Sequence, residues 1–307
     1  MTLVITSCTN RKRQPVSPDL HMSSLSPAPL DELVSHWSER LERETRRHPA
    51  SDVYGGRSFQ EARATAAKLG AKLVVVSAGL GLIEASTPIP SYGCTVMVGA
   101  DDGVRSRVPD AFSIASWWRA VSKASCFSLS LEDLVRDHPG PLLIALSQTY
   151  LDMLTPDLMA LPAEHLVRVR IFTGSPIDRT PEALRPYRMP YDHRLDGPDS
   201  PLQGTGNDFA SRALAHFVTM GCGRVPQSFL AEDVKAVASE IASWREPKKF
   251  DRKRYDDKEM RKFIEQYWES AGGSASRLLR YFRDELDIAC EQSRFAALAR
   301  QVRDGRI

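Results

Sequence analysis

The chain has 307 residues, 42% of them hydrophobic, which is enough for one large domain or two smaller ones with a sizeable core. A formal net charge of only +2 excludes a polycation, so a nucleic-acid partner must be met by local basic patches. Five scattered cysteines without a C-x-x-C pair, no apolar stretch of roughly 20 residues and no signal-peptide core predict a cytoplasmic protein without disulfides or a membrane span.

Four short runs have the apolar, β-branched character of buried parallel strands, at residues 3–6, 73–77, 142–146 and 166–172. Helical spacing is found in four segments, at 30–47, 59–69, 112–122 and 209–220. The alternation predicts an α/β fold of three layers, with helices on both faces of a four-stranded parallel sheet. Ligands bind beyond the carboxyl ends of such strands, so we expect the polar turns that follow the four strands to gather at one edge.

Two irregular segments interrupt this pattern: 15–29 is rich in Pro and Ser, and 178–206 is dense in Pro, Gly and Asp. From about residue 225 strand-like runs almost disappear, while charges and helical spacing continue to the end. We therefore predict an α/β catalytic domain over 1–225 and a helical, partly basic domain over 226–307.

The turn after the first strand reads SCTNRKR and carries several polar candidates. The amide of Asn10 can hold and orient a water, whereas a thiol such as Cys8 at a strand end is more often a packing residue. Arg11, Lys12 and Arg13 either form a solvated face or contact phosphates.

Aromatic and small residues follow at the next two turns. Tyr54 and Arg57, in YGGRSF, suit stacking on a base and binding of a phosphate, although a structural turn explains them equally well. Ser77 and Gly79 would let backbone groups approach a flat ligand, and Tyr92 would supply an aromatic wall.

The later turns add hydrogen-bonding groups. Gln148 offers a donor and an acceptor to a base edge, while Gly174 and Ser175 can present donors to a leaving group or phosphate. Asp208 is a further candidate for substrate binding, but it lies four residues before Arg212, and an i,i+4 ion pair is the simpler interpretation.

In the C-terminal region, Arg277 and Arg280 recur on one helical face and are candidate DNA-phosphate contacts. The alternative is a solvated amphipathic helix whose apolar side, with Leu278, Leu279 and Phe282, packs inward.

No phosphate-binding loop, G-x-S-x-G elbow, H-E-x-x-H or zinc-deaminase spacing occurs in the sequence. These absences disfavour metal-dependent hydrolysis and zinc deamination, so we expect neither a metal nor a cofactor.

Three segments carry a resemblance to a known group: SCTNRKR, the unit from VYGGRSF to VVVSAGLGLIE, and PSYGCTV. Together they resemble an uncharacterised-domain family of 7-deazaguanine DNA-modification clusters and a domain of archaeosine synthase. That group is related to the uracil-DNA glycosylase superfamily, some of whose prokaryotic members act as antiphage glycosylases. The resemblance implies a uracil-DNA glycosylase-like fold, and it covers residues 1–100 well and 140–220 loosely.

The resemblance also implies roles for individual residues. Asn10 occupies the place of the residue that orients water, and Thr173-Gly174-Ser175-Pro176 that of the loop that stabilises the leaving base, here without the loop's histidine. In archaeosine synthase a lysine and a Pro-Tyr follow the cysteine; Lys12 lies near Cys8, but the Pro-Tyr is missing.

The leading hypothesis is a monomeric DNA N-glycosylase that excises a modified base, such as glucosylated hydroxymethylcytosine, in antiviral defence. One alternative is an enzyme that modifies a deazaguanine base in DNA through attack of Cys8 on a nitrile. Another is a protein that binds modified DNA without catalysis. The sequence leaves open which base is the substrate, and whether Asn10 or a carboxylate of residues 178–208 activates water.

Overall fold

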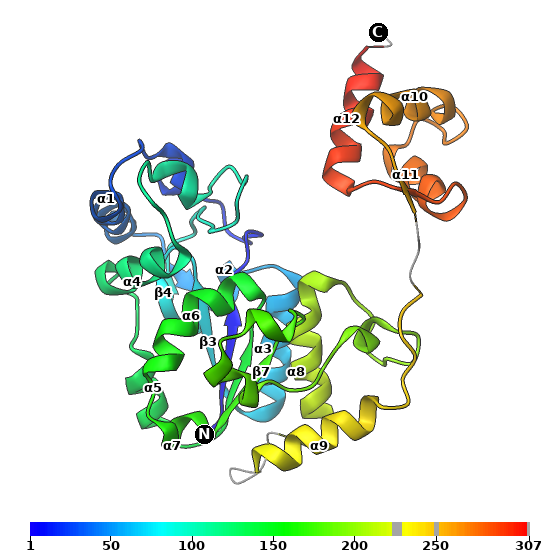
Figure 1. Cartoon of the computed structure of the whole chain (residues 1–307). Coiled ribbons are helices and arrows are strands. Elements are labelled where there is room, and N and C mark those ends of the chain that lie inside the picture. Colours follow the sequence, from blue (N-terminus) through cyan, green and yellow to red (C-terminus); the bar gives the residue numbers. More distant parts are fainter. Residues whose placement is uncertain (223–228, 249–251, 306–307) are drawn as a thin grey trace. The chain divides into compact units, whose positions relative to one another are not determined.

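The computed structural model describes residues 1–222, 229–248 and 252–305, and the chain divides into two compact units, Met1–Pro247 and Lys248–Ile307 (Figure 1). Each unit has its own hydrophobic core. Among the described helices, none is both long enough and apolar enough to cross a membrane.

A five-stranded sheet forms the centre of the first unit, in the order β4-β3-β1-β6-β7. Its strands are β1 (Leu3–Ser7), β3 (Lys72–Ser77), β4 (Gly81–Glu84), β6 (Leu142–Ala145) and β7 (Val169–Phe172). The four predicted strands are parallel neighbours, with Val4 paired to Leu73 on one side and Leu143 on the other.

The prediction of a purely parallel, four-stranded sheet is wrong, because β4 adds an antiparallel fifth strand at the edge. After Ser77 the chain turns back, and Gly81 adopts a left-handed backbone conformation with φ of 79°. Glycine tolerates this conformation without steric cost, so the chain re-enters the sheet beside the strand that it has just left.

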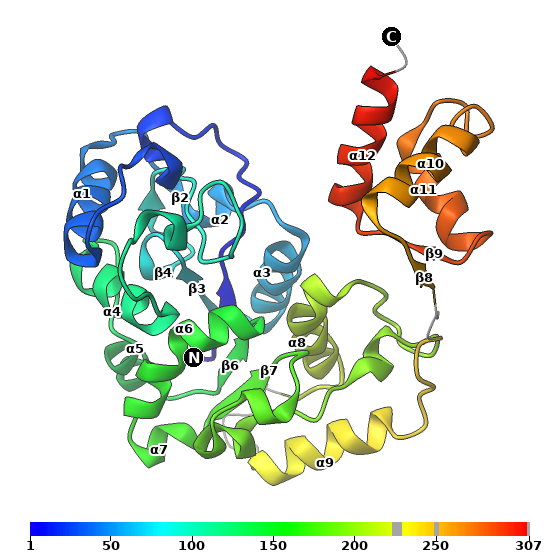
Figure 2. The same cartoon turned by 45° about the horizontal axis from the view of Figure 1, so that its top comes forward.

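Helices cover both faces of the sheet, as the sequence predicts (Figures 1 and 2). On one face, α3 (Arg57–Leu69) and α8 (Phe209–Thr219) pack against each other and against β1, β6 and β7. On the other face, α4 (Ile114–Ala124) packs on β4, and α1 (Leu30–Arg43) and α6 (Gln148–Ala160) pack on α4.

Short elements complete the first unit: β2 (His48–Pro49), α2 (Ala50–Val53), β5 (Pro88–Ile89), α5 (Leu131–Asp137) and α7 (Ala163–Leu166). The irregular segment predicted at 178–206 contains three 3-10 turns, Ile177–Arg179, Glu182–Tyr187 and His193–Asp196.

The first unit extends to Pro247, so the boundary predicted at residue 225 is too early. The helix α9 (Leu230–Ile241) buries Val237 and Ile241 in the core of the first unit. Its Asp233 also lies 2.7 Å from Arg170 of β7, and both side chains are buried. Amphipathic spacing is sufficient to predict this helix. Its packing in the core of the first unit depends on contacts with β7, which is distant in the sequence.

The second unit consists of α10 (Asp257–Tyr267), α11 (Ala275–Asp284) and α12 (Gln292–Asp304), with β8 (Lys253–Arg254) parallel to β9 (Ile288–Ala289). Its helical character is as predicted, apart from this short strand pair. Ser274 accepts a hydrogen bond from the backbone of Arg277 and so caps α11.

Candidate functional site

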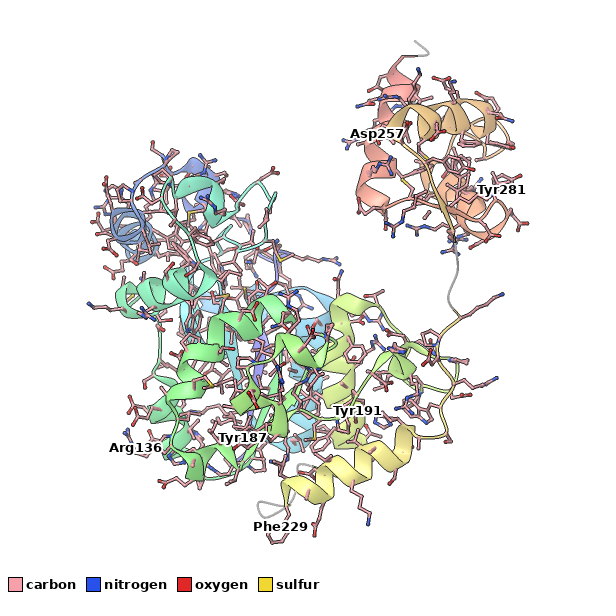
Figure 3. The ribbon with its side chains drawn as sticks, viewed as in Figure 1. Arg136, Tyr187, Tyr191, Phe229, Asp257 and Tyr281 are labelled. Carbon is pink, nitrogen blue, oxygen red and sulfur yellow. The ribbon has the colours of Figure 1, made fainter. Side chains whose placement is uncertain are left out.

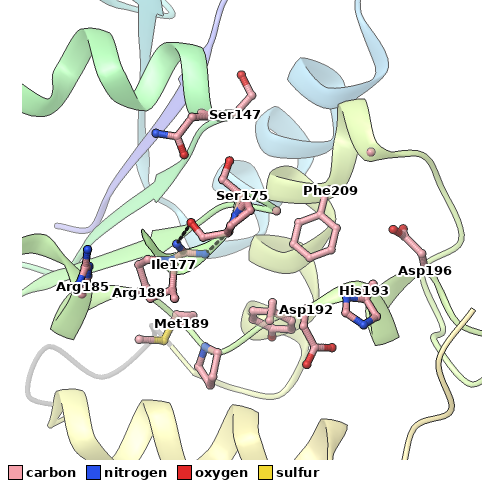
Figure 4. Close-up of a pocket in the computed structure, with 16 residues that line it drawn as sticks. Ser147, Ser175, Ile177, Arg185, Arg188, Met189, Asp192, His193, Asp196 and Phe209 are labelled. Atoms are coloured by element: carbon pink, nitrogen blue, oxygen red, sulfur yellow. Dashed lines mark hydrogen bonds between the residues drawn. The ribbon is translucent and has the colours of Figure 1, made fainter. Parts of the chain in front are cut away.

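A cavity of about 760 Å³ lies beyond the carboxyl ends of β6 and β7 (Figure 4). Its walls come from the start of α6, the turn after β7, residues 185–196 and the start of α8. Such a cavity has the size of typical small-molecule sites, and it lies at the edge of the sheet where α/β proteins bind ligands.

Gln148, the first residue of α6, lines this cavity and carries an unsatisfied polar atom. Its amide nitrogen donates to Asp152 Oδ1 at 2.5 Å and to the Arg179 carbonyl at 3.2 Å. Because both partners are acceptors, the amide orientation is determined. Its Oε1 is buried and has no hydrogen-bond partner among the described residues. A buried acceptor of this kind is costly unless a ligand or water satisfies it.

Two aromatic residues and a methionine form an apolar part of the cavity wall. Phe209, at the start of α8, lines the cavity together with Tyr191 and Met189. A side chain at Gly174 would approach the Phe209 ring to 3.0 Å, so glycine lets the turn after β7 pack closely on that ring. Tyr191, labelled in Figure 3, has its hydroxyl 2.9 Å from Nδ1 of His216, a hydrogen bond that fixes its position.

Two carboxylates also line the cavity. Asp192 is held by the Arg194 guanidinium, which lowers the pKa of this carboxyl. Asp196 accepts from Arg212 through Oδ1 at 2.5 Å, and Oδ2 has no hydrogen-bond partner within the described part of the chain. Both groups come from the 178–208 segment that the sequence left open as a source of a catalytic carboxylate.

The turn carrying Ser175 is held in place by one arginine. Arg188 donates to the carbonyls of Ser175 and Pro176 and to the Thr180 hydroxyl. The Ser175 hydroxyl lies 3.3 Å from that of Thr173. Ser175 and Gly174 both line the cavity, together with Gln148, so the structure brings these three predicted site residues together.

Asp208 and Arg212 form a buried ion pair at 2.8 Å, which confirms the simpler interpretation of their spacing. Asp208 is only 2% exposed, and Arg57 lies 3.1 Å from its other oxygen. Arg57 also donates to the Gln203 carbonyl. Asp208 is therefore satisfied by protein groups and lies outside the cavity lining, in contrast to its predicted role in substrate binding.

A second group of side chains surrounds the end of β1, and we call it the thiol–tyrosine cluster. It consists of Cys8, Lys12, Tyr54, Ser77, Tyr92 and Tyr150. The Tyr92 hydroxyl lies 2.9 Å from that of Tyr54 and 2.5 Å from that of Ser77. Burial raises the pKa of both tyrosines, so their hydroxyls stay protonated at neutral pH.

Lys12 and Cys8 are the other members of this cluster that lie near the end of β1. The Lys12 ammonium lies 4.6 Å from the centre of the Tyr92 ring and 5.2 Å from that of Tyr54, and it donates to the Thr9 carbonyl. Burial lowers the pKa of this lysine, and Cys8 opposes that shift electrostatically. The Cys8 sulfur lies 3.3 Å from the Tyr150 hydroxyl and is 3% exposed.

The cluster corrects several predicted roles, because its members pack against one another rather than around the cavity. Tyr54, Tyr92 and Ser77 are fully buried, so they do not form an open aromatic wall. Gly79 is required by close packing, since a side chain there would meet the Tyr92 ring within 2.8 Å. Its carbonyl accepts a hydrogen bond from Trp37.

The remaining predicted residues of the first turn are exposed. Asn10, Arg11 and Arg13 lie on the surface, and Asn10 is not part of the cavity lining. The expected water-orienting residue and the expected leaving-group loop are therefore not brought together in this structure. Lys12 is half-buried and belongs to the thiol–tyrosine cluster, rather than to a row of three solvated cations.

Sequence reasoning missed other cavity residues, notably Tyr191, His193, Asp196 and Phe209. The signal for the first three is the density of Pro, Gly and Asp at 178–206, typical of a long loop that follows a strand and carries function, whereas Phe209 follows that segment. Figure 4 shows Phe209, His193 and Asp196 on one side of the cavity and Ser175 and Arg188 on the other.

Within the described ranges, no three His, Cys, Asp or Glu side chains gather as metal ligands would. No protein-family model, curated protein or solved structure matches this chain.

Proposed function

We propose that this chain is a DNA N-glycosylase that excises a modified nucleobase and leaves an abasic site. The proposal depends above all on Gln148, a residue that lines the same cavity as Phe209 and whose Oε1 is buried without a hydrogen-bond partner among the described residues. A nucleobase has a flat face that stacks on such a ring and an edge that hydrogen-bonds to such an amide.

The free atom of Gln148 is an acceptor, so it favours a base edge that donates an N–H group. The exocyclic amino group of a cytosine-type base meets this requirement. The cavity volume of about 760 Å³ supports a base that carries a bulky substituent. Such bases occur in modified phage DNA, which fits a role in antiviral defence.

We assign water activation to Asp196 in preference to Asn10, because Asp196 lines the cavity and has a free carboxylate oxygen among the described residues. Water would attack C1′ as the bond to the base breaks, and its proton would pass to this carboxylate. Asp192, kept ionised by Arg194, would stabilise the positive charge that develops on the sugar. The Ser175 hydroxyl would donate to the departing base, which leaves with the bonding electron pair.

The test incubates the full chain with unmodified duplex DNA and with duplex DNA that contains glucosylated hydroxymethylcytosine. Free base and abasic sites are then measured by mass spectrometry. We expect release from the modified DNA, and loss of release in Asp196→Asn with DNA binding retained. DNA binding without release of base from either substrate would overturn the proposal and favour a non-catalytic binding protein.

A second function is favoured by the presence of Lys12 and Cys8 in the same thiol–tyrosine cluster, where Cys8 acts electrostatically on Lys12. In this alternative the Cys8 sulfur bonds to the nitrile carbon of a deazaguanine base, and the nitrile nitrogen gains a proton, which yields a thioimide. The 3% exposure of Cys8 makes this the weaker candidate, since the substrate must reach a buried sulfur. Loss of activity in Cys8→Ala, with activity retained in Asp196→Asn and Asn10→Ala, would favour it over hydrolysis.

A further inference from the structure

The exposed face of α11 in the second unit carries two arginines that form no ion pair with any residue that the structure describes. Leu278, Leu279 and Phe282 of this helix are buried, so Arg277 and Arg280 point to solvent one turn apart. Neither guanidinium has an ion-pair or hydrogen-bond partner among the described residues. The interpretation of α11 as an amphipathic helix with its apolar side packed inward is therefore confirmed. It does not explain why two unpaired arginines lie on the outer face.

Four other arginines of the second unit contact protein groups. Arg294 pairs with Asp257 at 2.7 Å, and Arg303 with Asp304 at 3.0 Å. Arg283 donates to the Cys290 carbonyl, and Arg252 donates to the carbonyl of Arg283. The guanidinium groups of Arg277 and Arg280 differ from these four, and they share their lack of a partner among the described residues with exposed Arg254 of β8.

The surroundings of these two arginines suit a phosphate chain. Tyr281, labelled in Figure 3, follows Arg280 on the helix and is 38% exposed. Its ring centre lies 5.6 Å from that of Tyr267. A groove of about 340 Å³ between α11 and α12 begins at Ser276 and includes Arg280. The first turn of α11 adds the positive end of the helix dipole beside Arg277. The one acidic group lining this groove, Asp284, lies at the other end of the helix.

We infer that this face of α11 binds the sugar–phosphate backbone of duplex DNA without reading its sequence. Guanidinium groups bind phosphate oxygens in a bidentate manner, and contacts of this kind position a protein on the duplex. The inference goes beyond the proposed function, because it assigns DNA holding to a unit that contains none of the cavity residues. It does not require that any base be released.

The test measures binding of the full chain to a short fluorescein-labelled duplex of unmodified bases, by anisotropy, at several salt concentrations. Loss of two phosphate contacts in Arg277→Ala/Arg280→Ala lowers the slope of log K against log salt by about 1.8. Between about 50 and 200 mM salt the affinity of the unchanged chain then falls about 12-fold more than that of the variant. Arg300→Ala/Arg303→Ala, with the same spacing on α12 and the same charge change, leaves the slope unchanged.

Arg277→Lys/Arg280→Lys keeps both charges and is expected to restore the slope, and circular dichroism checks that each variant is folded. An unchanged slope in the α11 alanine variant, or an equal fall in the α12 variant, would overturn the inference. Base release by the same proteins is scored separately. Release with an unchanged slope contradicts only the role of α11, whereas a reduced slope without release contradicts only the glycosylase proposal.

Discussion

Gln148 shows how a single residue serves both fold and site. Its amide nitrogen ties the start of α6 to Asp152 and to the Arg179 carbonyl, which leaves the amide oxygen buried and free. A buried acceptor without a partner typically makes the folded state less stable by about 1–3 kcal/mol. A ligand that donates to this oxygen recovers that free energy, which makes the residue a sensitive probe of the cavity.

Gln148→Met keeps the length of the side chain and removes the amide. We expect kcat/KM for base release to fall about 10- to 100-fold, because a hydrogen bond of about 1.4–2.8 kcal/mol to the base is lost. Gln60→Met is the matched control, since Gln60 donates to the Tyr54 carbonyl away from the cavity. Equal effects of the two variants on base release would show that Gln148 does not contact the base.

His216 makes the wall of the cavity sensitive to acid. Burial lowers the pKa of this histidine, whose Nδ1 is bonded to the Tyr191 hydroxyl. At a pH between the lowered pKa and the ordinary histidine pKa, His216 is protonated in the unfolded chain but not in the folded chain. The free energy of unfolding therefore decreases as pH falls through this range. We expect His216→Asn, which keeps a hydrogen-bonding side chain but does not titrate, to flatten this dependence.

The dependence is measured by denaturant unfolding between about pH 7.5 and 5.5, a range chosen around the ordinary histidine pKa. Other histidines contribute equally to both proteins, so the difference between the two curves isolates His216. Parallel curves for the unchanged chain and the variant would contradict the assignment.

The sequence identified Gln148, Gly174 and Ser175 because each closely follows a strand, and the ends of parallel strands meet at one edge. It did not identify Asp196 or Tyr191. Their positions depend on how the irregular 178–206 segment folds back over that edge, and no periodicity encodes such a path.

At the scale of elements, contiguous apolar runs were sufficient to predict four strands and their parallel arrangement. β4 was missed because it has only four residues and begins at a left-handed glycine, Gly81. The helix α9 was recognised as helical, yet its membership of the first unit depends on the pairing of Asp233 with Arg170. Such long-range contacts cannot be derived from local spacing.

The link between α8 and the loop before it depends on Arg212. This buried guanidinium pairs with Asp208 and Asp196 and donates to carbonyls of the same loop, including that of Thr205. We expect Arg212→Ala to lower the free energy of unfolding by about 3–5 kcal/mol, because the buried Asp208 carboxylate loses its closer ion-pair partner and keeps only the partly exposed Arg57. Urea denaturation measures the change.

Arg245→Ala is the control for this prediction, since it removes an arginine–aspartate pair at the surface, that of Arg245 with Asp199. Exposed pairs contribute little, so its unfolding curve should nearly coincide with that of the unchanged chain. If both variants lost the same stability, burial of the Arg212 pair would have no special importance.

At the scale of the whole molecule, the chain contains two hydrophobic cores, one in each unit. The second unit has few residues with which to build its core, and domains of this size are only marginally stable. Phe282 is fully buried there and packs edge-on against Phe295 and Tyr267. The stability of this unit should therefore depend strongly on that one ring.

Phe282→Ala is expected to remove about 3–5 kcal/mol, a loss comparable with the whole stability of a small domain. Calorimetry should then show a single remaining transition, that of the first unit. Base release at saturating DNA should persist, because the cavity lies entirely in the first unit, whereas release at low DNA concentration should fall with the loss of the α11 surface.

Phe172→Ala, which opens a comparable space in the first core, should instead abolish release at every DNA concentration. Equal loss of release at saturating DNA in both variants would mean that the second unit contributes to the reaction itself.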